Sequence, residues 1–235
     1  PIADAEVVGE QLASPEKAEI DSVMKSWGTL TVPSSILAVI DASGSMDFPA
    51  GDTTRMALAV NAARTALVAF PSHARIGLWA FSINQGGPGQ DWRELAPLRR
   101  LDAPTEGGRT QVELLDDQAG VLAGLTQGGT GLYDTVLDAY RTATREYNPS
   151  YYNTVAVLSD GANDDPGSIG LRALLKELRQ LHDPDRPVRI IPVGISTDAD
   201  MAALRRIAAA TESRAYEAAN PQDILTVLAQ GLLTR

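Results

Sequence analysis

Short apolar runs alternate with longer amphipathic stretches along the chain. The run from Ile36 to Ile40 ends abruptly in Asp41, which is typical of a strand buried on both faces of a parallel sheet. Further strands are predicted at 75–81, 92–98, 155–158, 188–193 and 214–218. Helices are predicted at 54–70, 110–125, 132–147, 168–181, 200–210 and 221–233. This alternation predicts an α/β fold with a doubly wound, mostly parallel central sheet and helices on both faces.

Two of these helices have apolar residues at helical spacing. In the helix at 54–70, which Pro71 stops, the predicted buried side consists of Met56, Ala59, Val60, Ala63, Leu67 and Val68. In the helix at 168–181 a leucine stripe comprises Leu171, Leu174, Leu175, Leu178 and Leu181. Stripes at this spacing predict the sides that pack on the sheet.

The chain ahead of the first strand is organised differently. Ser14 and Pro15 form a helix-start signature, and a short helix with one apolar face follows at about 15–27. We therefore divide the chain into an N-terminal extension at 1–33 and a main domain at 34–235. The short helix either packs on the side of the main domain or is the tail of a preceding domain, which would make this chain part of a longer multidomain protein.

Composition excludes several classes of function. The 235 residues carry a net charge of −10, which argues against a nucleic-acid partner. The chain has no cysteine, so no disulfide, thiolate metal site or cysteine nucleophile is available. No run reaches the ~20 apolar residues of a membrane span, so we expect no membrane insertion by this segment. Neither a nucleophile elbow nor a nucleotide-binding glycine motif is present, so we expect no enzymatic activity, no catalytic residues and no nucleotide cofactor.

Polar residues follow the first strand at regular spacing. Asp41, Ser43 and Ser45 lie two residues apart, so in an extended turn their side chains can converge and offer oxygen ligands to a hard divalent cation. The alternative is an ordinary strand-to-helix loop, in which Asp and Ser cap the next helix. These residues alone do not decide between the two.

Three loops together resemble the von Willebrand factor type A family. They are Asp-x-Ser-Gly-Ser at 41–45, Gly-Gly-Thr-x-Leu-Tyr-Asp at 128–134 and Ser-Asp-Gly at 159–161, in the order and spacing of that family. In that family the three loops form the metal-ion-dependent adhesion site, or MIDAS. The resemblance covers roughly residues 34–234, and it implies the Rossmann-like sheet of the family, with the strand at 92–98 antiparallel.

The resemblance implies five metal-site residues. Ser43 and Ser45 are expected to be direct hydroxyl ligands, and Thr130 a direct or water-mediated ligand that depends on conformational state. Asp41 and Asp160 are expected to act largely through water. The expected ion is Mg²⁺, with Mn²⁺ or Ca²⁺ as substitutes. We expect Asp41 to be an exposed loop acid whose replacement by Ala abolishes metal binding and leaves the fold intact.

The donor set implies a function. Because hydroxyl groups are neutral, the ion remains under-neutralised and can accept an Asp or Glu side chain of a protein partner. The leading hypothesis is therefore a divalent-cation-dependent adhesion or interaction module, extracellular or at the surface of a bacterial cell. The alternative is a cytoplasmic assembly subunit of the same fold that works with a AAA+ ATPase. Asp164 and Asp165, which follow the third loop, are either a second cation site or charges at its rim.

Overall fold

The computed structural model describes residues 33–219, 223 and 227. The N-terminal extension, apart from Pro33, lies outside these residues, and so does nearly all of the predicted helix at 221–233. Among the described residues, the main sheet consists of β1 (Ser34–Asp41), β4 (Arg75–Phe81), β5 (Trp92–Arg100), β6 (Tyr152–Ser159), β7 (Val188–Ile195) and β8 (Tyr216–Ala218). The α-helices are α2 (Arg55–Ala69), α3 (Gln111–Val121), α4 (Leu132–Arg145), α5 (Leu171–Leu181) and α6 (Met201–Ala209).

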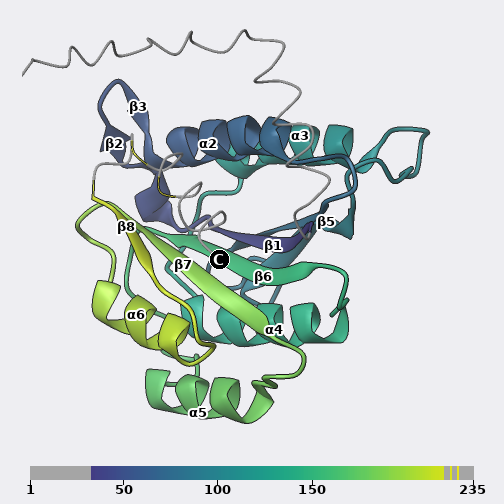
Figure 1. Cartoon of the computed structure of the whole chain (residues 1–235). Helices are drawn as coiled ribbons and strands as arrows, with labels where there is room; N and C mark the ends of the chain where they lie inside the picture. Colours follow the sequence, from purple (N-terminus) through teal and green to yellow (C-terminus); the bar gives the residue numbers. More distant parts are fainter. Residues whose placement is uncertain (1–32, 220–222, 224–226, 228–235) are drawn as a thin grey trace, which may run out of the picture. The chain divides into compact units, whose positions relative to one another are not determined.

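The central sheet confirms the predicted fold class. Its spatial order is β5-β4-β1-β6-β7-β8, and only β5, paired with β4, is antiparallel. Helices α2 and α3 cover one face, and α4, α5 and α6 cover the other (Figure 1). After β1 the chain builds the β4 side of the sheet and then returns to place β6 on the other side of β1. The sheet therefore has a topological switch point at the carboxyl ends of β1 and β6, where open α/β sheets bind ligands.

Strand β1 shows how the apolar run forms the core. Its side chains alternate between the two faces, so that Ile40 packs in the cluster beneath α2 and α3. Leu37 and Val39 pack instead with α4, α5 and α6. A strand that packs on both faces needs apolar residues at every position, which explains the unbroken run in the sequence.

One side chain that was predicted to be buried in the helix at 54–70 is exposed instead. Met56, Ala59 and Val60 of α2 are buried, whereas Val68 is 87% exposed. At 3.6 residues per turn, Val68 lies about 120° around the helix from Met56, outside the stripe that faces the sheet. The prediction that Val68 is buried was wrong for this reason.

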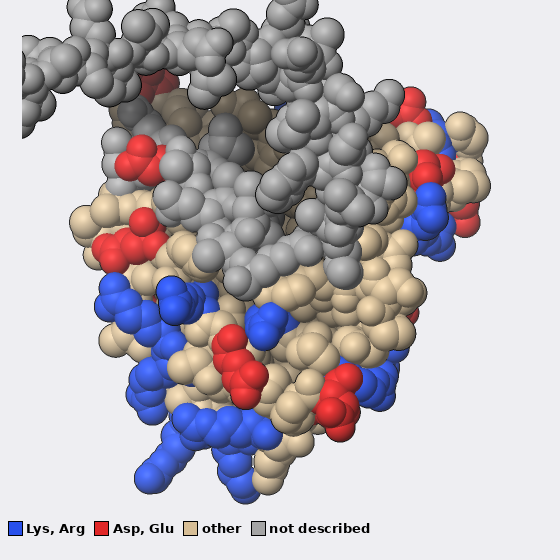
Figure 2. All heavy atoms as spheres, viewed as in Figure 1, with Lys and Arg blue, Asp and Glu red and all other residues tan. Residues whose placement is uncertain are grey.

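Helix α5 is amphipathic in the predicted way. Leu174, Leu175 and Leu178 are buried against the sheet side of the molecule. The opposite side of the helix exposes three basic residues, Arg172, Lys176 and Arg179. On the face that Figure 2 shows, Lys and Arg side chains gather over α5 and α6.

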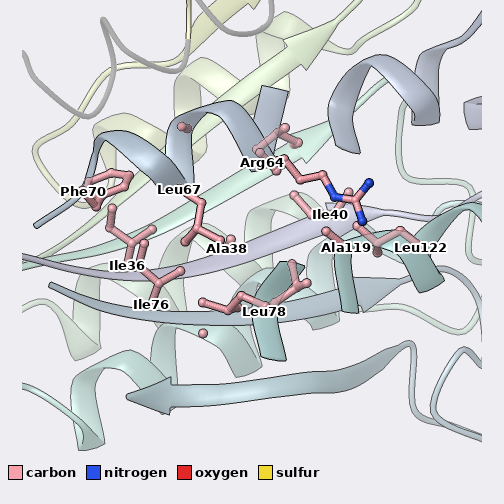
Figure 3. Close-up of a pocket in the computed structure, with 16 residues that line it drawn as sticks. Ile36, Ala38, Ile40, Arg64, Leu67, Phe70, Ile76, Leu78, Ala119 and Leu122 are labelled. Carbon is pink, nitrogen blue, oxygen red and sulfur yellow. The ribbon is translucent and has the colours of Figure 1, made fainter. Parts of the chain in front are cut away.

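A small apolar pocket lies between α2 and the sheet (Figure 3). Its volume is about 80 Å³, and it is lined mainly by aliphatic side chains that include Ile36 and Ile40 of β1 and Leu67 and Phe70 of α2. A cavity with this lining offers no ligands to an ion, so the candidate chemistry lies at the carboxyl edge of the sheet instead. Within the described part of the chain, no helix has both the length and the apolar character needed to cross a membrane.

Candidate metal centre

Three loops meet at the carboxyl ends of β1 and β6. Asp41 is the last residue of β1, and Asp160 directly follows β6. Backbone hydrogen bonds join the loop after β1 to the glycine-rich loop, from Gly44 N to Gly128 O at 2.9 Å and from Gln127 N to Ala42 O at 2.9 Å. These two loops are thus joined by main-chain contacts that do not depend on their polar side chains.

Asp41 lies at the bottom of this site. Its side chain is fully buried, and its two carboxylate oxygens accept hydrogen bonds from the Ser43 backbone N–H at 2.8 Å and from Ser159 Oγ at 2.6 Å. Burial raises the pKa of Asp41 from 3.8 to about 7, against the lowering effect of these hydrogen bonds. The expectation of an exposed loop acid was therefore wrong, because the loops that converge on β1 cover the end of the strand.

The two serines form a chain of hydrogen bonds that leads to Asp160. Ser43 Oγ lies 3.1 Å from Ser45 Oγ, and Ser45 Oγ donates to Asp160 Oδ1 at 2.7 Å. Ser43 is the N-cap of a short 3₁₀ helix, Gly44–Asp47, but its side chain makes no capping hydrogen bond. The N-cap of α2 is Thr54, whose side chain accepts from Ala57 N. The structure thus disfavours the capping alternative and brings both hydroxyl groups to one point with a carboxylate.

Thr130 is placed against the loop that follows β6. It is 4% exposed, and a methyl group built on Gly161 would lie 3.3 Å from Thr130 Oγ1. The Thr130 hydroxyl therefore lies against the backbone of the loop that carries Asp160. The Thr130 backbone N–H donates to Asp164 Oδ1, and the Asp164 N–H donates to Thr130 O at 3.1 Å. Asp164 is thus an acceptor that holds this loop.

Arg55, the first residue of α2, was not predicted as part of the site. Arg55 Nη1 donates to Asp160 Oδ2 at 2.7 Å, and Nη2 donates to Asp198 Oδ2 at 2.6 Å. Asp160 has no exposed surface, so this ion pair balances a charge that water cannot reach. Ser159 was also not predicted as a partner of Asp41, although it is the first residue of the Ser-Asp-Gly loop at 159–161.

A second group of acids lies beside the glycine-rich loop. Carboxylate oxygens of Asp91, Asp134 and Asp165 lie within 4.8 Å of one another, at a pocket of about 400 Å³. Burial, followed by the charges of Asp165 and Asp134, raises the pKa of Asp91. The Asp91 carboxylate also lies against Gly131, where any side chain would collide with it. Asp165 thus faces a cluster separate from the hydroxyl groups of Ser43 and Ser45.

The donors that meet after β1 suit a hard cation. Hydroxyl and carboxylate oxygens are the ligands that Mg²⁺, Mn²⁺ and Ca²⁺ take in proteins. The Ser45 hydroxyl already donates to Asp160, and the Ser43 hydroxyl lies 3.1 Å from that of Ser45. The residue types and their convergence therefore fit a divalent ion.

The von Willebrand factor type A domain model matches residues 35–230, which is most of the chain. The chain belongs to this family. Domains of the family are generally interaction modules, and a MIDAS is typical of their fold. A search of the curated proteins finds no match.

Solved structures show the same von Willebrand factor type A fold. A protein of this type from Catenulispora acidiphila is 21% identical with a TM-score of 0.63, over 83% of this chain and 40% of that chain. The pilus adhesin SpaC from Lactobacillus rhamnosus GG is 17% identical with a TM-score of 0.65, over 87% of this chain and 31% of that chain. Proximal thread matrix protein 1 from the mussel byssus, with a zinc-occupied MIDAS motif, is 14% identical with a TM-score of 0.62, over 85% of this chain and 47% of that chain. This chain thus spans less than half the length of each of them.

Proposed function

We propose that this von Willebrand factor type A domain binds a divalent cation and presents it to an acidic side chain of a protein partner. The observation that carries the proposal is the hydrogen-bonded series from Ser43 through Ser45 to Asp160 at the switch point of the sheet. Two neutral hydroxyl groups and a buried carboxylate converge there, beside the Thr130 loop. This donor set suits an ion that needs one more negative ligand to complete its shell.

The residues have different roles in this proposal. Ser43, Ser45 and Thr130 supply hydroxyl oxygens to the ion. Asp41 and Asp160 supply negative charge, largely through water, and Asp41 also fixes the loop by accepting the Ser43 backbone N–H. When bound, the ion supplies a positive charge that a carboxylate can reach.

The proposed ion is Mg²⁺, with Mn²⁺ or Ca²⁺ as substitutes. The proposed partner group is an exposed Asp or Glu, because a carboxylate can replace a water on the ion in a partly desolvated pocket, where ionic attraction is stronger than in bulk water. A Lys or Arg on the partner cannot do this. The zinc-occupied MIDAS of the byssus protein supports metal binding by this fold.

We propose a role in adhesion at a cell surface, without enzymatic activity. The similarity to a pilus adhesin and to a byssus matrix protein favours this role over that of a cytoplasmic subunit of a AAA+ ATPase assembly. Because the chain spans less than half the length of these proteins, we also propose that it works as one domain of a longer chain.

The experiment uses a peptide array on which each Asp- or Glu-containing peptide has an Asn or Gln counterpart. In Mg²⁺ we expect binding to acidic peptides only, and we expect EDTA or Thr130→Ala to abolish it. Thr65→Ala is the matched control, because Thr65 is exposed on α2 and its hydroxyl bonds only to the carbonyl of its own helix. Binding that survives both EDTA and Thr130→Ala would place the interaction surface elsewhere.

A further inference from the structure

Arg55 stands at a position that disfavours a cation. It is the first residue of α2, and the first turn of that helix contains no acidic residue. The N-terminus of a helix carries a partial positive charge, so a basic side chain there is normally destabilising. Two acids from distant parts of the chain, Asp160 and Asp198, compensate for this arrangement.

The guanidinium group of Arg55 is held from three sides. It pairs with Asp160 at 2.7 Å and with Asp198 at 2.6 Å. Its central carbon lies 5.5 Å from the centre of the Phe48 ring, and the Arg55 backbone N–H donates to Phe48 O at 3.1 Å. The Arg55 side chain is only 11% exposed. This positive charge is therefore fixed at the edge of the metal centre and does not move freely in solvent.

Both oxygens of Asp160 are already in use. Oδ1 accepts from Ser45, and Oδ2 accepts from Arg55. Asp160 itself has no exposed surface, so the cation that balances its charge is Arg55 and not solvent. A divalent ion that is attracted to Asp160 thus encounters a carboxylate that already has a positive partner.

We propose that Arg55 is an internal counter-ion of the metal centre, which competes with the divalent cation for Asp160 and so lowers the affinity of the site for metal. This inference rests on the proposed function, because it concerns the same ion. The ion and Arg55 share one buried negative charge, and each weakens the attraction of the other for it. A partner carboxylate supplies the missing negative charge, so Arg55 makes metal occupancy depend on the presence of a partner.

The test is calorimetric titration of the protein with Mn²⁺ alone. In Arg55→Gln the competing charge is absent, and we expect Mn²⁺ affinity to rise on the order of 10- to 100-fold, the usual range of coupling between two sites. Arg55→Lys keeps the charge, so its affinity should stay close to that of the wild type. The matched control is Arg64→Gln on the same helix, where Arg64 pairs with the exposed Asp116 and its replacement should leave Mn²⁺ affinity unchanged.

The outcomes separate this inference from the proposed function. A folded wild-type protein that binds no Mn²⁺ would overturn the proposed function itself. Wild-type binding combined with an unchanged or weaker affinity in Arg55→Gln would overturn only the role of Arg55.

Thermal denaturation of the same variants provides a second readout. Without Arg55 the buried Asp160 charge loses its cationic partner, so Arg55→Gln should melt at a lower temperature in EDTA, and Mn²⁺ should raise its melting temperature by more than it raises that of the wild type. An equal rise in melting temperature on addition of Mn²⁺ in the two proteins would contradict the inference.

A third measurement needs no variant and so does not depend on the folding of Arg55→Gln. Nuclear magnetic resonance of the wild-type protein should show that Mg²⁺ shifts the guanidinium signals of Arg55 together with the backbone amide of Ser45. A shift at Ser45 with unchanged Arg55 signals would mean that the ion and Arg55 do not share Asp160.

Discussion

Replacement of Asp41 by Asn tests the burial of this carboxyl group most sharply. The pKa of Asp41 is about 7 in the folded protein because the group is buried, against an ordinary value of 3.8. One pKa unit corresponds to 1.36 kcal/mol, so the charged form destabilises the ion-free fold by on the order of 4 kcal/mol above pH 7. The folded protein binds more protons than the unfolded chain between these two pKa values. The contribution of the Asp41 carboxyl group to the free energy of unfolding is therefore fully present below about pH 4 and is lost as pH rises to about 7.

Asn at position 41 has no charge but keeps the shape of Asp. Its side-chain oxygen can accept from the Ser43 N–H, and its amide can donate to Ser159. In EDTA at pH 8 we therefore expect Asp41→Asn to be more stable than the wild type by roughly 2–4 kcal/mol in urea unfolding, with the difference nearly gone at pH 4. Excess Mg²⁺ should stabilise the wild type at pH 8 by mass action and leave the variant unchanged. A difference between the two proteins that does not vary with pH would refute the claim that burial raises the pKa of Asp41.

Two further predictions concern packing. Leu178→Ala should lower the free energy of unfolding by about 2–5 kcal/mol, since Leu178 is fully buried. Val68→Ala should change it by less than about 0.5 kcal/mol, because Val68 is exposed. Equal effects of the two substitutions in urea unfolding would contradict the orientation of α2. Ala38→Val should add methyl groups to the apolar pocket beneath α2 and raise the free energy of unfolding by about 0.5–2 kcal/mol, and a lower melting temperature would show that the pocket cannot accept the larger side chain.

The sequence predicted the central strands well because β1, β4, β6 and β7 are buried on both faces. The unbroken apolar run that ends in Asp41 is typical of a central strand that packs on both faces, and β1 occupies that place. The hairpin formed by β2 (Pro49–Ala50) and β3 (Thr53–Thr54) was not predicted. Strands of two residues are too short to show a period of hydrophobicity.

The candidate site was predicted in its residue types but not in its electrostatics. The three loop motifs identified Asp41 and Asp160, yet their burial depends on how distant loops cover the end of β1. The pairing of Arg55 with Asp160 joins residues 105 positions apart, and its pairing with Asp198 joins residues 143 positions apart. No local pattern encodes such contacts. The cluster of Asp91, Asp134 and Asp165 was missed for the same reason, because its members come from three separate segments.

The hydroxyl groups after β1 and the Thr130 loop are proposed to hold a divalent ion. Anomalous diffraction from crystals grown with Mn²⁺ tests this proposal directly, because the signal locates the ion without reference to any partner. We expect a peak within ligand distance of the hydroxyl oxygens of Ser43 and Ser45, with Asp41 and Asp160 in the surrounding shell. A peak only among Asp91, Asp134 and Asp165, or no peak at either place, would contradict the proposal.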